Sequence, residues 1–204
     1  MAEKKNNVPL KIKALRLFHQ DGIIDIISGA VLVNFGFDIL NQSETTSLYT
    51  WIPILLLSSL KNKTTLPRLG YESLGGDENQ IKRWTFFPAA GMVLAMVVLG
   101  IFTLGDQIDL QNTIILPFPG NSRNLISSSI LAAALFIAGY LISLKRFYVY
   151  AVVALGSGLI SYFSLPLYFP FFLTAGVMLA YGARLMITFT RAYPLDPERK
   201  NNEK

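Results

Sequence analysis

Six apolar stretches constrain the fold of this 204-residue chain more than any other feature. A helix of ~20 apolar residues crosses the ~30 Å hydrocarbon core of a bilayer. Charged residues make up 15% of the chain, against about 25% in an ordinary soluble domain. The sequence therefore predicts an all-α integral membrane bundle of six transmembrane helices: Ile23–Leu40, Thr45–Leu60, Trp84–Leu104, Leu125–Leu144, Phe147–Phe163 and Phe169–Thr190.

The basic residues favour one orientation of this bundle. If the spans alternate and the N-terminus lies inside, seventeen of the eighteen Lys and Arg residues lie inside and only Arg123 lies outside. Basic residues close to a span resist translocation, so this distribution predicts cytoplasmic N- and C-termini. We expect a multi-pass protein of the cell inner (plasma) membrane. The net charge of +5 reflects the same bias, so nucleic acid is not an expected partner.

The chain divides into three parts. Residues 1–20 form a cytoplasmic N-terminal segment, 21–191 the six-span domain and 192–204 a cytoplasmic tail. Within the first part an amphipathic helix is expected over residues 8–20, lying at the membrane interface; the alternative is a plain extension of the first span. Its apolar face holds Leu10, Ala14, Leu17 and Phe18, and its polar face Lys13, Arg16 and Gln20. The second span is short and contains Pro53, but five basic residues follow it and none precedes it in its outer connection, which favours a crossing.

Polar and small residues of the first span predict a packed seam. At about 100° per residue, Asp21, Asp25 and Ser28 share one face. Three glycines at intervals of seven (Gly22, Gly29, Gly36) border that face and predict the close approach of another helix. We expect Asp25 to form an intramembrane ion pair with Arg184 of the last span, because their depths match. Such a pair is either a structural link or a transport-linked site; in the remaining alternative Arg184 extends to the surface.

The residue inventory excludes several chemistries. The chain has no cysteine and a single histidine, His19, which rules out thiolate sites and a zinc-ligand cluster. Gly156-Ser157-Gly158 resembles the serine motif of intramembrane proteases, but no histidine base lies on another span. No phosphate-binding loop is present. We therefore expect no catalytic residues, no cofactor and no metal.

The cytoplasmic loop of residues 61–83 contains a constrained turn. Pro67 fixes its own φ and favours an extended Leu66, and Gly70 permits a φ that other residues resist. Arg68 and Tyr71 would then project from a stiff backbone. The interpretation is a docking surface for an anionic group, formed by Lys63, Arg68, Gly70, Tyr71, Lys82 and Arg83. The alternative is that Arg68 and Tyr71 tie the loop to the Lys145–Arg146 turn or to a helix end.

Two of these motifs resemble a known group of proteins. A Pro-Arg-hydrophobic-Gly-Tyr loop (Pro67–Tyr71), after a first span opened by Asp-Gly-x-x-Asp (Asp21–Asp25), is similar to that of uncharacterised prokaryotic polytopic membrane proteins. Those relatives tend to continue Val-Lys-Phe after the tyrosine, whereas this chain continues Glu72-Ser73-Leu74. The resemblance covers a small part of the chain. It implies a prokaryotic membrane protein and no particular activity.

The function expected from the sequence is non-enzymatic. We expect an inner-membrane protein that docks an anionic lipid headgroup or a partner protein through its basic cytoplasmic face. Its partners would be the bilayer, anionic lipids, and a membrane protein or further copies of itself. One alternative is a small oligomeric transporter or channel that uses Asp25 and Arg184, although spans 1–3 and 4–6 show no inverted repeat of the kind many transporters have. A third class, which also stays open, is a lipid-modifying enzyme.

Overall fold

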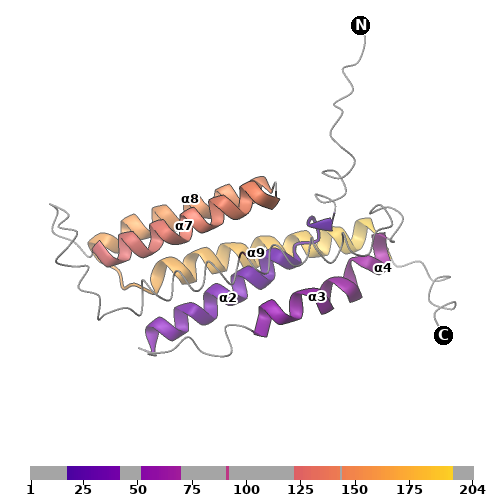
Figure 1. Cartoon of the computed structure of the whole chain (residues 1–204), viewed down its shortest axis with the longest axis horizontal. Helices are drawn as coiled ribbons and strands as arrows, with labels where there is room; N and C mark the ends of the chain where they lie inside the picture. The colour runs from indigo at the N-terminus through magenta and orange to yellow at the C-terminus, as the bar shows by residue number, and fades with distance from the viewer. Residues whose placement is uncertain (1–17, 42–51, 70–90, 92–121, 143, 195–204) are drawn as a thin grey trace, which may run out of the picture.

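The computed structural model describes residues 18–41, 52–69, 91, 122–142 and 144–194 (Figure 1). The described residues form helices and no strand, which confirms the predicted all-α class for this part of the chain. The helices are α2 (Ile23–Leu40), α3 (Ile52–Thr64), α4 (Leu66–Leu69), α7 (Ser122–Ile142), α8 (Lys145–Phe163) and α9 (Phe169–Ala192).

Three of these helices are long and apolar enough to cross a membrane. They are α2, α8 and α9, with 18, 19 and 24 residues. Helix α7 has a shorter apolar stretch, Asn124–Tyr140. The described part of the predicted second span, α3, has 13 residues and a length of about 20 Å, less than the ~30 Å core. The predicted third span lies outside the described residues except for Gly91, so the total of six spans stays a prediction.

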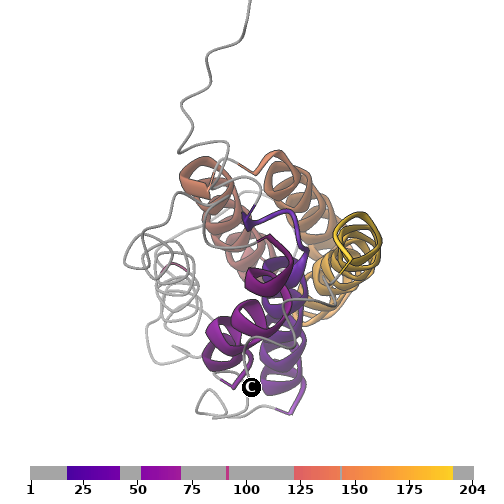
Figure 2. The ribbon, with the colours of Figure 1, turned by 90° about the vertical axis from the view of Figure 1, so that its right-hand side faces the viewer.

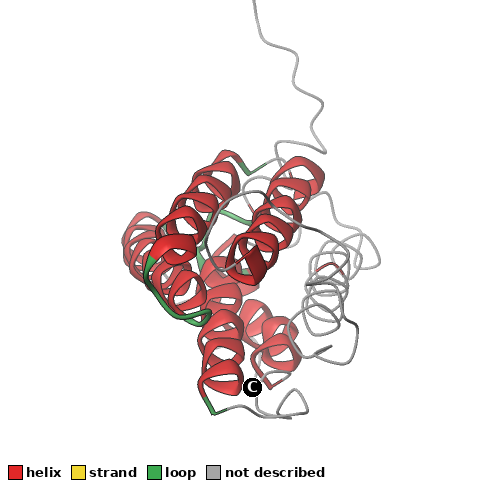
Figure 3. Cartoon of the chain, turned by 90° about the vertical axis from the view of Figure 1, so that its left-hand side faces the viewer, coloured by secondary structure: helices red, strands yellow, loops and turns green. Residues whose placement is uncertain are grey.

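The helices pack as two close pairs, α2 with α9 and α7 with α8, and the pairs meet where α8 contacts α9. Helix α2 packs on α9 and α3, α7 packs on α8, and α8 packs on α9. Figure 2 views the bundle from the end where α3 and α9 finish, and Figure 3 views it from the opposite end. The shared core contains Ile24, Phe35, Ala154, Phe171 and Met178, each at most 1% exposed.

The predicted glycine seam of α2 is confirmed, and its partner is α9. A Cβ on Gly29 would lie 2.8 Å from Cγ of Leu179, and one on Gly36 would lie 3.1 Å from the Phe172 ring. On the facing helix, a Cβ on Gly182 would lie 3.0 Å from Cβ of Asp25. Any larger side chain would force the two helices apart, so these glycines set the distance between α2 and α9.

Helices α7 and α8 form the predicted antiparallel hairpin, with two differences in detail. Helix α7 ends at Ile142 rather than at Leu144, and Lys145 and Arg146 begin α8 instead of forming the turn. The turn is closed by backbone hydrogen bonds from Leu144 N to Gly139 O (3.0 Å) and from Phe147 N to Leu144 O (3.1 Å). Arg146 therefore lies on a rigid helix, where its direction is set.

At its other end the hairpin is held by Asn124. Its Nδ2 donates to the Ser161 carbonyl (3.0 Å), to Ser161 Oγ (2.7 Å) and to the Leu165 carbonyl (2.9 Å). Near the same level Gly158 leaves room only for Ser128 of α7. The α7–α8 pair is thus tightly joined along its length.

Candidate functional site: a buried ionic cluster at one end of the bundle

Four charged side chains are buried where α2 begins, α3 ends and α8 begins. The side chains of Asp21, Asp25 and Lys61 are at most 1% exposed, and that of Arg146 is 12% exposed. Each aspartate pairs with one cation, and Lys61 also lies within electrostatic range of Asp25 and Arg146. A buried charge is tolerated only if it is paired and hydrogen-bonded, which both pairs achieve.

The first pair joins α2 to α3. Lys61 Nζ lies 3.2 Å from Asp21 Oδ2, which also accepts a hydrogen bond from the Thr65 hydroxyl. The other oxygen of Asp21, Oδ1, accepts the backbone N–H of Ile23 at 3.1 Å. One carboxylate therefore satisfies a free N–H group at the start of α2 and binds the end of α3.

The second pair joins α2 to α8. Arg146 Nη2 lies 2.7 Å from Asp25 Oδ2, as an ion pair without the alignment of a hydrogen bond. The Tyr150 hydroxyl donates to Asp25 Oδ1 at 2.9 Å. Arg146 and Tyr150 are four residues apart on a helix and so face the same neighbour. Together they supply both oxygens of the Asp25 carboxylate with a partner.

Both cations also bind the segment that leads into α2, residues 18–22, which we call the entry segment. Lys61 Nζ donates to the Phe18 carbonyl at 2.7 Å and lies 3.9 Å from the centre of the Phe18 ring. Arg146 Nη2 donates to the His19 carbonyl. The segment turns into α2 at Gly22, whose φ of 74° is in the left-handed region that suits glycine. A Cβ at Gly22 would also collide with the Gly182 carbonyl, so both backbone and space require glycine.

The partner of Asp25 differs from the predicted one. Asp25 pairs with Arg146, whereas the predicted partner Arg184 has an exposed side chain on α9. The predicted match in depth is present, because Gly182 of α9 contacts Asp25. Two residues further along a helix the side chain points about 200° away, so Arg184 faces outward. The sequence predicted the depth of Arg184 and not its direction.

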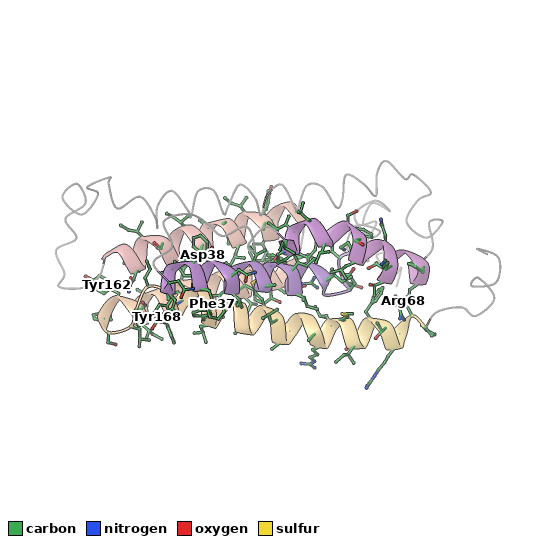
Figure 4. All side chains as sticks on the ribbon, turned by 90° about the horizontal axis from the view of Figure 1, so that it is seen from below. Phe37, Asp38, Arg68, Tyr162 and Tyr168 are labelled. Carbon is green, nitrogen blue, oxygen red and sulfur yellow. The ribbon has the colours of Figure 1, made fainter. Side chains whose placement is uncertain are left out.

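Arg68 is bound to the end of α9. Its Nη1 donates to the carbonyls of Thr190 (3.1 Å) and Tyr193 (2.7 Å). This contact agrees with the alternative prediction, in which Arg68 ties the loop to a helix end. Leu66 is helical in α4 rather than extended as expected. Of the other predicted docking residues, Lys63 is exposed, and Gly70, Tyr71, Lys82 and Arg83 lie outside the described residues. Figure 4 shows Arg68 at one end of the bundle and Phe37, Asp38, Tyr162 and Tyr168 towards the other.

Exposed cations surround the buried cluster. The side chains of Lys63, Lys145, Arg184 and Arg191 are exposed at or near this end of the bundle. The two described carboxylates here, Asp21 and Asp25, are both occupied by buried cations. The described residues of this end, which is defined by the start of α2 and the ends of α3 and α9, therefore carry a net positive charge, and we call it the basic end.

Four members of the cluster were not predicted from the sequence: Lys61, Thr65, Arg146 and Tyr150. Lys61 and Arg146 entered the prediction only through the number of basic residues on the inner side. The four-residue spacing of Arg146 and Tyr150 could have indicated that both side chains face the same neighbour. Ser157 is buried and donates to the Ala154 carbonyl at 3.0 Å. No group of three or more metal-ligating side chains occurs among the described residues.

Comparison with protein families, with curated proteins and with solved structures gives no match to this chain. The resemblance to prokaryotic membrane proteins therefore stays a prediction.

Proposed function

We propose that the chain is a non-enzymatic polytopic inner-membrane protein that docks anionic lipid headgroups through its basic end. One observation carries this proposal: Asp21 and Asp25, the two described carboxylates of this end, are paired with Lys61 and Arg146, while Lys63, Lys145, Arg184 and Arg191 remain exposed. Within the described residues, internal pairing thus leaves these exposed cations without a paired carboxylate. The same charge supports a cytoplasmic location for the basic end, through the resistance of basic residues to translocation.

The chemistry of the exposed cations suits a lipid surface. The cytoplasmic leaflet carries anionic lipids, and each Lys or Arg near it contributes about 1 kcal/mol. The attraction is long-range and screened by salt, with a Debye length of ~10 Å at 0.1 M. Binding through this surface should therefore weaken as the salt concentration rises.

The experiment compares lipid retention. The triple variant Lys63→Gln, Lys145→Gln, Arg191→Gln is purified in mild detergent beside wild type, and bound phosphatidylglycerol is measured by mass spectrometry at low and high salt. We expect wild type to retain this lipid at low salt and the triple variant to lose most of it. Arg123→Gln, predicted to lie on the opposite side, is the control and should retain it. A folded triple variant with wild-type retention would contradict the proposal.

A second candidate function is a small oligomeric transporter or channel. The observation that favours it is the burial of Asp25, 0% exposed, with Arg146 at the end of an apolar bundle. Ionisable groups at membrane depth frequently mark ion or proton paths. In this candidate Arg146 replaces Arg184 as the partner of Asp25.

Proton flux tests this second candidate. Wild type is reconstituted in vesicles that contain a pH-sensitive dye, and the dye signal is followed after a pH jump. We expect flux above that of protein-free vesicles, reduced in Asp25→Asn and unchanged in Asp38→Asn. Flux equal to that of protein-free vesicles would exclude a proton path.

A further inference from the structure

The two helix pairs of the bundle are each tightly joined, and a polar contact links them at the basic end. Glycines bring α2 and α9 together, and Gly158 with Asn124 holds α7 to α8. Small residues at these contacts let the two helices of each pair approach closely. We therefore expect any movement within the bundle to occur between the pairs.

Arg146 and Tyr150 form the polar contact between the pairs. From α8 they reach Asp25 of α2 at 2.7 and 2.9 Å, and Arg146 also binds the His19 carbonyl of the entry segment. On α9 this group neighbours Gly182, which contacts Asp25, and Tyr181, whose ring centre lies 6.4 Å from that of Tyr150. Lys61 binds the same entry segment from α3, so the whole beginning of α2 is held by cations from two directions.

A buried ion pair is a costly way to obtain stability alone. Replacing such pairs by apolar side chains of similar volume is often neutral or stabilising, because desolvation offsets the attraction. A polar contact, in contrast, can break and exchange its partners for water. An ionic contact between the two helix pairs, at the basic end of the bundle, is therefore suited to breaking and re-forming.

We propose that the Asp25–Arg146–Tyr150 contact is a gate that closes the basic end of the bundle between the α2–α9 and α7–α8 pairs. When the ion pair breaks, α8 separates from the start of α2 and water enters the core from the basic side. The gate goes beyond lipid docking and deepens the second candidate function, on which it rests. Opening exposes Ala154, one turn beyond Tyr150 on the same face of α8 and 0% exposed when closed.

Cysteine labelling measures the opening directly, because the chain contains no native cysteine. Ala154→Cys is the reporter, and Thr174→Cys of α9, also 0% exposed, is the second reporter. A water-soluble maleimide is applied to the reconstituted protein, and the labelling rates are compared in wild-type, Asp25→Asn and Asp25→Asn/Arg146→Gln backgrounds. The double variant removes the contact without leaving an unpaired buried charge.

We expect both gate variants to label Ala154→Cys roughly tenfold faster than the wild-type background, the factor that about 1.4 kcal/mol produces in an open–closed equilibrium. Labelling of Thr174→Cys should not change, and Asp38→Asn, the same substitution on the same helix, should leave both rates unchanged. An unchanged rate at Ala154→Cys would overturn the gate. Equal acceleration at both reporters, or a double variant that does not fold, would assign the contact to stability alone and overturn it too.

The labelling result is independent of transported substrate. Faster labelling of Ala154→Cys with no proton flux would keep the gate and reject proton transport. Flux with unchanged labelling would keep transport and reject the gate. The two failures are therefore distinguishable.

Discussion

Asp25 is a fully buried carboxylate at the start of α2. Its side chain is 0% exposed, and its two oxygens meet Arg146 and the Tyr150 hydroxyl. Asp21 is nearly as buried but has a larger share of its partners on the backbone and on Thr65. The chain thus satisfies two neighbouring carboxylates, Asp21 just before α2 and Asp25 in its first turn, by different means, so their substitutions should differ in effect.

Removing both members of the Asp25–Arg146 pair should cost less than the two single losses added together. Asp25→Asn leaves the Arg146 charge partly buried, and the expected loss in free energy of unfolding is on the order of 3–5 kcal/mol. Arg146→Gln should cost a similar amount. In the double variant no charge is stranded, so its loss should be smaller than the sum of the single losses.

Thermal unfolding in detergent measures this coupling. The pair Asp25→Asn and Arg184→Gln is the matched control, because Arg184 lies at a similar depth with an exposed side chain. Their effects should add. Additive losses for Asp25→Asn and Arg146→Gln would contradict the observed contact.

At the scale of elements, α9 organises the bundle. It packs on α2 through glycines of both helices and on α8 through side chains. Its last carbonyls have no partner within the helix. Arg68 of α4 supplies that partner. The short helix α4 therefore caps the carbonyl end of α9 and holds the end of α3 near it.

Arg68→Gln should destabilise the protein without affecting lipid retention. The substitution removes a cation from the negative end of the α9 dipole and weakens two hydrogen bonds, at an expected cost of about 1 kcal/mol. Arg68→Lys keeps the charge and can still donate from a single nitrogen, as Arg68 does through Nη1, so it should lose less. Melting temperature and bound phosphatidylglycerol are measured on the same samples. Lost lipid with an unchanged melting temperature would assign Arg68 to docking instead.

At the scale of the whole molecule, the basic residues of the described helices lie at or near one end, except Arg123 at the start of α7. The starts of α2 and α8 and the ends of α3 and α9 are joined there by Lys61, Arg146 and Arg68. Alternate threading of the chain through a membrane requires this arrangement of helix directions. Internal ion pairs then use the two described acids of that end, Asp21 and Asp25, while its described surface cations stay exposed.

Single cysteines test the topology. We expect cysteines at Glu44 and Asp106 to react with an impermeant reagent from outside sealed cells, and cysteines at Asp77, Lys145 and Lys204 to react only after permeabilisation. The physical reason is the inside bias of the basic residues. Labelling at position 77 in sealed cells would contradict six spans with cytoplasmic termini.

Helical periodicity and composition predicted several features of the described helices. They predicted the bounds of α2 and the close approach along Gly22, Gly29 and Gly36. They also predicted the hairpin of α7 and α8. Each of these follows from local geometry, since a helix of 3.6 residues per turn determines which side chains share a face.

Only the tertiary structure decided which elements meet. The sequence could not tell that α9 covers the glycine seam, that Arg146 rather than Arg184 reaches Asp25, or that Lys61 is buried against Phe18. A count of charges along the sequence cannot distinguish basic residues that lie at similar depths. They become distinct only when the rotation of each helix about its axis is set by packing against its neighbours, which turns Arg146 inward and Arg184 outward.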